Sequence, residues 1–368
     1  MDFKRLRLIA GASMCVLVAY ICANLAMDRL ARWVEVEQDG YLWWREEWMQ
    51  LFDAENYVNR GRNRILLAGS SEVREGFLFD EFEAELPGFD VYNNALSNHT
   101  LEMLLIVLQY IETAYGPAAM PQKIVLGVVP TFLLDEPSIS RSYLPRVIDR
   151  YSPFVSLDVE SQPARLIRKG RRGSVTARYR YLTHQARRYQ GALRGVMRAG
   201  ILSVFPGMAD RYWLRLGLVP SIYHHLPPID QRAQLQVWRR DLPSPPDPVA
   251  MGDTVRAQWA ALQAFLVAHD IDFYVVNLPQ STFLLDDYYK PVYDDYERLL
   301  RSVVGDVPFL DLARFLRDDE FRDTTHPNLA AARRVSRRVA QFLREADAVR
   351  HQHPAARRAP SIDASGRS

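Results

Sequence analysis

Short apolar runs that alternate with amphipathic stretches constrain the fold of this chain most strongly. Residues with helical spacing of apolar side chains follow or separate these runs, at 101–111, 253–270 and 328–346. Strands buried on both faces read as nearly continuous apolar runs, and helices between them cover the sheet. The pattern therefore predicts an α/β fold with a parallel sheet covered on both faces. The predicted strands lie at 65–68, 89–93, 123–129, 272–279 and 307–312.

The N-terminus combines a basic flank with a long uncharged segment. Residues 1–7 include three basic side chains, and the 20 residues from 8 to 27 carry no charge. A helix of that length spans about 30 Å, which matches the apolar core of a bilayer. Since basic flanks stay cytoplasmic, we expect a single-pass anchor at 8–27 with the rest of the chain outside the cytoplasm. A cleaved signal peptide is the alternative, because Ala23 and Ala26 offer weak cleavage sites.

Composition divides the remainder of the chain. Residues 28–60 are rich in tryptophan and charge, which favours a membrane-proximal helical segment. The apolar runs place the main domain at 61–347, interrupted by a long insertion at 134–251 that we expect to be helical. Residues 348–368 are rich in Ala, Arg, Pro and Ser and are predicted to be disordered.

Charge is strongly segregated within the insertion. Residues 161–209 contain 11 lysines and arginines and no acidic residue, although the whole chain has a net charge of only +2. This stretch is either a solvated basic face or a surface for anionic lipid headgroups or an anionic glycan. The low net charge and the lack of a nucleic-acid motif argue against nucleic acid as a partner.

The positions of the two cysteines exclude two kinds of site from most of the chain. Cys15 and Cys22 both lie in the predicted anchor, so the rest of the chain cannot form a disulfide framework or a cysteine zinc site. We expect no metal site and no cofactor.

Two polar motifs bracket the predicted sheet. Gly69-Ser70-Ser71 interrupts the first apolar run, where either serine could serve as a nucleophile at a strand end. Asp323 and His326 lie three apart on one loop before the last helix. The carboxylate can accept the imidazole Nδ1–H, which leaves Nε2 as a base for a serine. Each motif alone is more often an ordinary turn, but together they favour nucleophilic catalysis.

The order and context of these motifs resemble the SGNH (GDSL-like) hydrolase superfamily. The resemblance implies a three-layer α/β/α sandwich with Ser71 as nucleophile, and with Asp323 and His326 completing a triad. Backbone N–H groups of Ser71 and Asn98 would form the oxyanion hole. Ser70 stands where the family often carries Asp. The matching blocks are AGSS at 68–71, VYNNALSNHT at 91–100 and DTTHPN at 323–328.

The middle blocks depart from the family pattern. Asn98 stands where the second block usually has glycine, and Pro130 or Thr131 replaces the asparagine donor of the third block. A missing donor costs about two to three orders of magnitude in rate unless another group substitutes. Such departures are typical of the membrane-anchored SGNH-like proteins of bacterial envelope modification. The stretches LLAGSSEVREGF, VYNNALSN and KIVLGVVPTFLL resemble those proteins.

Three further side chains are candidate substrate contacts. Glu72 and Arg74 flank the predicted nucleophile and either contact substrate or pair with each other. His99 lies in the second block, where an ordinary role in a polar loop is the alternative.

The resemblance implies a serine acyltransferase or esterase on the periplasmic side of the inner membrane. It would O-acetylate or deacetylate an envelope polysaccharide or exopolysaccharide. Its expected partners are a polysaccharide or acylated glycan and a multi-pass membrane O-acyltransferase. The degenerate middle blocks support a different interpretation, a catalytically decayed domain that binds glycan or a membrane partner. A lipid-acting hydrolase is a third possibility, because the anchor holds the domain near a membrane.

Overall fold

A computed structural model describes residues 63–96, 100–130, 229–241 and 247–352, with short pieces at 148, 152, 155–158, 165–169 and 245. All of them belong to one compact unit, which covers 43–170 and 224–368. None of the helices in this described part has both the length and the apolar character needed to span a bilayer. The predicted anchor, the membrane-proximal segment and most of the basic stretch lie outside the described residues.

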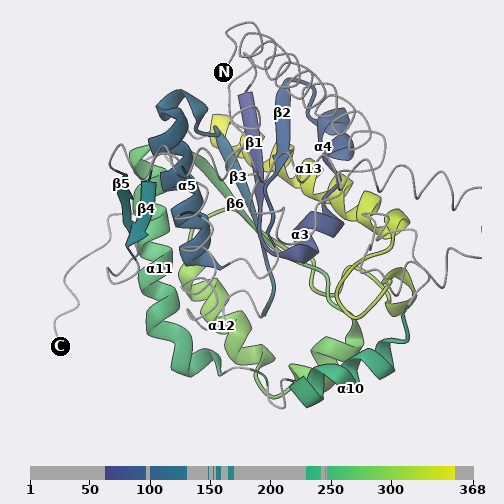
Figure 1. The fold of residues 1–368 in the computed structure, drawn as a ribbon. Coiled ribbons are helices and arrows are strands. Elements are labelled where there is room, and N and C mark those ends of the chain that lie inside the picture. The colour runs from purple at the N-terminus through teal and green to yellow at the C-terminus, as the bar shows by residue number, and fades with distance from the viewer. Residues whose placement is uncertain are drawn as a thin grey trace, which may run out of the picture. The chain divides into compact units, whose positions relative to one another are not determined.

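Five strands form a central sheet, and every neighbouring pair in it is parallel (Figure 1). The α/β prediction with a parallel sheet is confirmed at this level. The side chains of β1 are buried after its first residue, and those of β3 are buried throughout. In sheet order the strands are β2 (Phe89–Asn93), β1 (Asn63–Ala68), β3 (Lys123–Val128), β6 (Asp272–Asn277) and β7 (Phe309–Asp311).

Prolines trim the strands relative to the sequence prediction. β3 ends at Val128 rather than at 129, and β6 ends at Asn277 rather than at 279. Pro130 and Pro279 come shortly after these ends, and a proline has no N–H for the ladder. β7 begins only after Pro308 for the same reason.

The helices form two groups on opposite sides of the sheet (Figure 1). The chain leaves β1 toward β2 on one side and comes back to β3 on the other, as right-handed crossovers require. One group comprises α3 (Ser71–Gly76), α4 (Phe79–Glu85) and α13 (Leu329–Gln352), and the other α5 (Leu101–Tyr115), α11 (Pro248–Ala268) and α12 (Tyr293–Val304). Short turns complete the connections at η3 (Pro117–Ala119), η5 (Phe283–Tyr288, a π-helix) and η6 (Asp318–Glu320).

Two helices extend beyond their predicted ends. α11 begins at Pro248, ahead of the expected cap at Asp253 or Thr254, because proline suits the first turn of a helix. α13 continues to Gln352, where the sequence predicted an end at 346. Arg350 Nη1 lies 2.6 Å from Asp272 Oδ1, and this ion pair holds the last turns on the sheet. The predicted disordered tail therefore starts too early, since residues 348–352 are helical.

The described parts of the insertion are not all helical, which corrects the prediction for 134–251. β4 (Val155–Asp158) and β5 (Arg165–Arg168) form an antiparallel pair. Val155 and Leu157 are buried while Ser156 is only half-buried, which is the period of two that a strand shows. The helical part is α10 (Gln231–Asp241), and the last predicted residues of the insertion belong to α11.

An ionic cluster ties the amino ends of β3 and β6 to α13. Lys123 Nζ lies 3.2 Å from Asp272 Oδ2 and 2.8 Å from Asp347 Oδ1. The Tyr274 hydroxyl donates a hydrogen bond to Asp347. Burial of the Tyr274 hydroxyl and this bond to the carboxylate raise the pKa of Tyr274 above its usual range. The cluster anchors the helix that begins shortly after His326, so it also restrains the predicted site.

Gly69 joins β1 to α3 in a backbone conformation that other residues rarely adopt. Its φ is +145°, and an added Cβ would lie 2.6 Å from the Gly127 carbonyl oxygen and 2.4 Å from Val73 Cγ2. We expect Gly69→Ala to lower the free energy of unfolding by about 3 kcal/mol, because strain and overpacking both oppose the methyl group.

Urea unfolding measures this effect, and Gly88→Ala is the matched control. A Cβ at Gly88 meets nothing within 4 Å, so the control should change the free energy of unfolding by about 0.5 kcal/mol or less. Equal stability of the two variants would contradict the described turn.

Candidate active site

The strand order brings the two predicted motifs to one edge of the sheet. Gly69, Ser70 and Ser71 come directly after β1, and the loop at 312–328 follows β7. Parallel strands place their carboxyl ends at the same edge. The connections from β1 to β2 and from β2 to β3 run on opposite faces of the sheet, so the carboxyl end of β1 lies where the strand order reverses, a place at which open α/β sheets commonly bind ligands.

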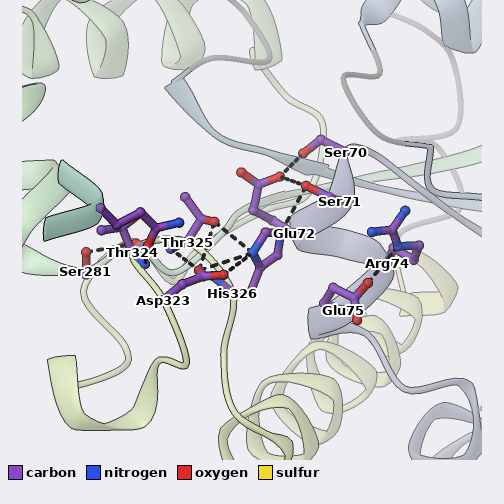
Figure 2. Close-up of polar contacts among 11 residues, drawn as sticks. Ser70, Ser71, Glu72, Arg74, Glu75, Ser281, Asp323, Thr324, Thr325 and His326 are labelled. Carbon is purple, nitrogen blue, oxygen red and sulfur yellow. Dashed lines mark hydrogen bonds and ion pairs between the residues drawn. The ribbon is translucent and has the colours of Figure 1, made fainter. Parts of the chain in front are cut away.

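Ser71, His326 and Asp323 form a continuous chain of hydrogen bonds (Figure 2). His326 Nε2 lies 3.0 Å from Ser71 Oγ, and His326 Nδ1 lies 2.9 Å from Asp323 Oδ2. The Asp323 side chain is fully buried, and the His326 side chain is 14% exposed. With Nδ1–H donated to the carboxylate, Nε2 accepts the serine O–H. The arrangement can move a proton from Ser71 to His326.

The same geometry separates the two serines. His326 contacts Ser71 Oγ, whereas Ser70 is buried and its hydroxyl donates to the Glu72 carboxylate. Of the two serines in the motif, Ser71 is therefore the one placed to act with a base.

Asp323 is held by its own turn. Its Oδ1 accepts hydrogen bonds from the backbone N–H groups of Thr325 (2.8 Å) and His326 (2.7 Å). The Arg322 N–H donates to the His326 carbonyl at 2.9 Å, which closes the loop. Asn328 Oδ1 then accepts the Ala331 N–H at 3.0 Å and caps α13. These bonds fix the carboxylate and the imidazole relative to each other before any substrate binds.

Thr325 adds a hydroxyl that sequence reasoning did not single out. Its Oγ1 lies 3.2 Å from Asp323 Oδ1 and 3.0 Å from His326 Nδ1. The hydroxyl can donate to the carboxylate and so restrain the plane in which Asp323 meets the ring. Its place between Asp323 and His326 in the DTTHPN motif is the sequence feature that could have identified Thr325 as part of the site.

The returning end of the insertion supports this loop from outside. Gln234 Oε1, on α10, accepts the Thr324 N–H at 2.9 Å. Ser281 Oγ donates to the Thr324 carbonyl at 2.8 Å, and the Ile229 N–H donates to the Arg322 carbonyl at 2.7 Å. No pattern in the sequence pointed to Gln234, because the contact joins segments that are far apart along the chain.

Ser71 is the first residue of α3, which starts as soon as β1 ends. The Ser70 carbonyl accepts the N–H groups of Val73 (3.1 Å) and Arg74 (3.2 Å). As the first helical residue, Ser71 has no acceptor for its own N–H within the helix. That N–H is therefore suited to the predicted role as an oxyanion donor.

The loop after β2 packs beside this turn. The Asn93 side-chain amide donates to the Phe77 carbonyl at 3.0 Å, at the far end of α3. The Leu96 N–H donates to the Gly69 carbonyl at 3.0 Å. Asn93 thus positions α3, a role that sequence reasoning missed, although an asparagine at a strand end often bonds nearby backbone.

Asn98 is the second predicted oxyanion donor and His99 a candidate substrate contact, while Pro130 or Thr131 stands in place of the asparagine donor of the third block. Asn98, His99 and Thr131 lie outside the described residues. Pro130 follows β3 and is buried, and it has no N–H to donate. Within the described part of the chain, the Ser71 N–H is the predicted oxyanion donor that can be placed.

Glu72 and Arg74 have different partners. Glu72 Oε2 accepts a hydrogen bond from Ser70 Oγ and lies 3.3 Å from Ser71 Oγ, whose proton is donated to the closer His326 Nε2. Arg74 Nε donates to Glu75 Oε1 at 2.7 Å. The expected pairing of Glu72 with Arg74 is therefore wrong, since Glu72 lies at the two serines and Arg74 pairs with Glu75, and contact of either side chain with substrate stays a prediction.

Carboxylates surround the imidazole of His326. Burial of the ring lowers its pKa, but the charge of Asp323 and its hydrogen bond, together with the charges of Glu72 and Glu75, outweigh burial. The pKa of His326 is therefore raised above its usual value. The protonated ring is stabilised, which also favours the imidazolium that forms when a serine proton is taken up.

This shift predicts the pH dependence of any activity that uses neutral His326. We expect kcat/KM to rise with pH, with a midpoint above the usual imidazole pKa of about 6.5. Glu75→Gln and Glu72→Gln each remove a charge that favours the protonated ring, so the midpoint should move to lower pH. A pH–rate profile with p-nitrophenyl acetate measures it, and an unmoved midpoint in both variants would contradict the electrostatics described.

The raised pKa of His326 also determines how the stability of the fold changes with pH. Because the pKa is higher in the folded state, protonated His326 stabilises the fold, fully below the unfolded pKa of about 6.5. That contribution is lost as the pH rises through the folded pKa. Stability and activity at this residue therefore respond to pH in opposite directions.

Two hollows in the described surface lie away from the triad. One is lined mainly by α11 and α12, including Arg256 and Arg298, and the other by Tyr293, Asp311 and Arg314 beside β7. Neither is lined by a triad residue, so side-chain chemistry rather than the size of a hollow identifies the candidate site.

A scan of protein-family models gives no match for this chain, and a search of curated proteins finds no significant match.

Proposed function

We propose that this protein is a serine-dependent acyltransferase or esterase of the SGNH type, with a three-layer α/β/α fold. The hydrogen-bonded chain from Ser71 through His326 to Asp323 carries this proposal. The parallel sheet supports it, with the nucleophile after β1 and the base directly before the last helix. The resemblance of the two end motifs to that superfamily points the same way.

Acyl transfer follows from the geometry in two balanced steps. Ser71 Oγ attacks the carbonyl carbon of an acyl ester while His326 Nε2 takes the serine proton. The Ser71 N–H donates to the developing oxyanion, and the leaving alcohol departs with the proton from His326. An acceptor hydroxyl or water then attacks the acyl-Ser71 ester, and Ser71 regains its proton from His326.

The setting proposed for this chemistry is the periplasmic face of the inner membrane. The uncharged segment at 8–27 and its basic flank support a single-pass anchor. The acyl group we propose is acetyl, and the acceptor is a hydroxyl of an envelope polysaccharide or exopolysaccharide. A multi-pass membrane O-acyltransferase is the proposed partner, and water in place of the sugar would make the protein an esterase.

The decayed, glycan-binding alternative draws its support from the altered middle blocks. Pro130 supplies no N–H at the end of β3, in agreement with a weakened oxyanion hole. The intact distances between Ser71, His326 and Asp323 favour catalysis over this alternative.

Trapping the acyl-enzyme tests the proposal directly. The purified full-length protein is mixed with p-nitrophenyl acetate, quenched in acid and digested for mass spectrometry. We expect an acetyl-sized mass increase on the peptide that contains Ser71, with a burst of p-nitrophenol. The absence of both the burst and the modified peptide would overturn the proposed function and favour the binding alternative.

A further inference from the structure

Glu72 carries a carboxylate that the acylation step does not use. It follows Ser71 in α3 and is only 9% exposed. One of its oxygens, Oε2, accepts a hydrogen bond from the Ser70 hydroxyl and lies 3.3 Å from Ser71 Oγ. The other oxygen, Oε1, receives no hydrogen bond from the described residues, and Figure 2 shows it turned away from both serines.

Glu72 as a whole is largely buried, but its Oε1 atom is open to solvent, so water or a bound hydroxyl can reach it. Glu72 Oε2 lies 3.3 Å from Ser71 Oγ, so Oε1 of the same carboxylate is also within a few ångströms of the nucleophile. A hydroxyl of a molecule bound at Ser71 is therefore within reach of Oε1.

Two acceptors then border the space beside an acyl group on Ser71. His326 Nε2, 3.0 Å from Ser71 Oγ, would take the proton of an attacking hydroxyl. Glu72 Oε1 would accept a second hydroxyl of the same molecule. Hydroxyls on adjacent carbons have a spacing that allows both bonds at once, whereas a single alcohol can make only one.

Charge narrows the class of acceptor further. Asp323, Glu72 and Glu75 all act on His326 as negative charges, and Arg74 pairs with Glu75. A carboxylate or phosphate on the acceptor would meet repulsion from these groups at short range. A neutral polyol would avoid this repulsion and could donate its hydroxyls to the carboxylate of Glu72 and to His326 Nε2.

We propose that Glu72 binds the acyl acceptor and that this acceptor is a neutral vicinal diol, such as a sugar ring presents. The inference rests on the acyl-Ser71 chemistry proposed above. The attacking hydroxyl gives its proton to His326 Nε2 and its oxygen bonds the acyl carbon. The bond from that carbon to Ser71 Oγ then breaks, and Ser71 Oγ takes the proton from His326. The neighbouring hydroxyl stays hydrogen-bonded to Glu72 throughout.

Acceptor competition tests the role of Glu72. The full-length protein receives p-nitrophenyl acetate as donor and either 1,2-propanediol or 1,3-propanediol, which have the same composition but different hydroxyl spacing. We expect wild-type protein to form the monoacetate of the 1,2-diol about tenfold faster, the effect of one hydrogen bond to a charged group. The preference should fall to about threefold in Glu72→Gln, whose amide oxygen is a weaker acceptor, and to about one in Glu72→Ala.

The ratio compares two acceptors on one acyl-enzyme, so it does not depend on the fraction of folded protein. Glu75→Gln is the matched control, because Glu75 pairs with Arg74 and should keep the tenfold preference. A wild-type ratio near one, or an unchanged ratio in Glu72→Ala, would overturn the role of Glu72 while the p-nitrophenol burst still supported acyl-Ser71. No burst in wild-type protein would instead overturn the proposed function, and this inference with it.

Discussion

Replacing Ser71 with alanine should reduce the release of p-nitrophenol from p-nitrophenyl acetate to background, a fall of about 10⁴-fold or more. The reason is that the Ser71 hydroxyl is the group in contact with His326 Nε2, at 3.0 Å. Without Oγ no acyl-enzyme can form, so the burst should also disappear. Stopped-flow absorbance measures both quantities.

Covalent labelling gives the same prediction an independent readout. A fluorophosphonate reagent should label wild-type protein at Ser71 and leave Ser71→Ala unlabelled. Ser70→Ala is the matched control, since it removes a neighbouring hydroxyl that contacts Glu72 rather than His326. Labelling of Ser71→Ala at the wild-type rate would mean that the nucleophile is elsewhere.

Replacing Asp323 with asparagine should lower kcat by about 10⁴-fold while the chain still folds. Asp323 accepts the His326 Nδ1–H at 2.9 Å, and this bond sets the tautomer that leaves Nε2 as the base. An asparagine can still accept the N–H groups of Thr325 and His326 through its amide oxygen. Its NH₂ group would face the imidazole, however, and favour the wrong tautomer.

Burst kinetics with p-nitrophenyl acetate measure the effect of Asp323→Asn, and urea unfolding verifies that the protein is folded. Asp318→Asn is the matched control on the same loop. Asp318 accepts the Thr282 N–H at 2.7 Å, is half-buried and makes no contact with the triad, so its replacement should leave kcat close to wild type. A kcat for Asp323→Asn within tenfold of wild type would contradict the role given to Asp323.

Much of the fold could be predicted from local sequence patterns. The five apolar runs all form strands, and the inner strands show the reason most clearly, because a strand buried on both faces must be apolar along its length, as in Ile65–Ala68 of β1. Helix and strand ends were less accurate, since Pro248 starts α11 and Arg350 extends α13 through a contact with Asp272. The antiparallel pair β4 and β5 was missed, because two strands of four residues leave little periodic signal.

In the candidate site, too, contacts within one loop could be predicted from the sequence, whereas contacts between distant segments could not. Asp323 and His326 could be paired from sequence because three residues separate them on one loop, and the loop geometry is local. Their approach to Ser71 depended on a family resemblance, since no local rule brings a turn after the first strand to a loop after the last. Asn98 and His99 lie outside the described residues, so their roles stay predictions.

The sequence by itself determined that this chain forms a parallel α/β sheet and that Asp323 can orient His326, because periodicity and short spacing are local properties. Only the tertiary structure decided which serine meets the imidazole and what surrounds it. The parallel direction of the strands puts the carboxyl ends of β1 and β7 on the same side of the sheet, and the start of α3 aims Ser71, not Ser70, at His326. The same turn of helix brings the Glu72 carboxylate within 3.3 Å of Ser71 Oγ.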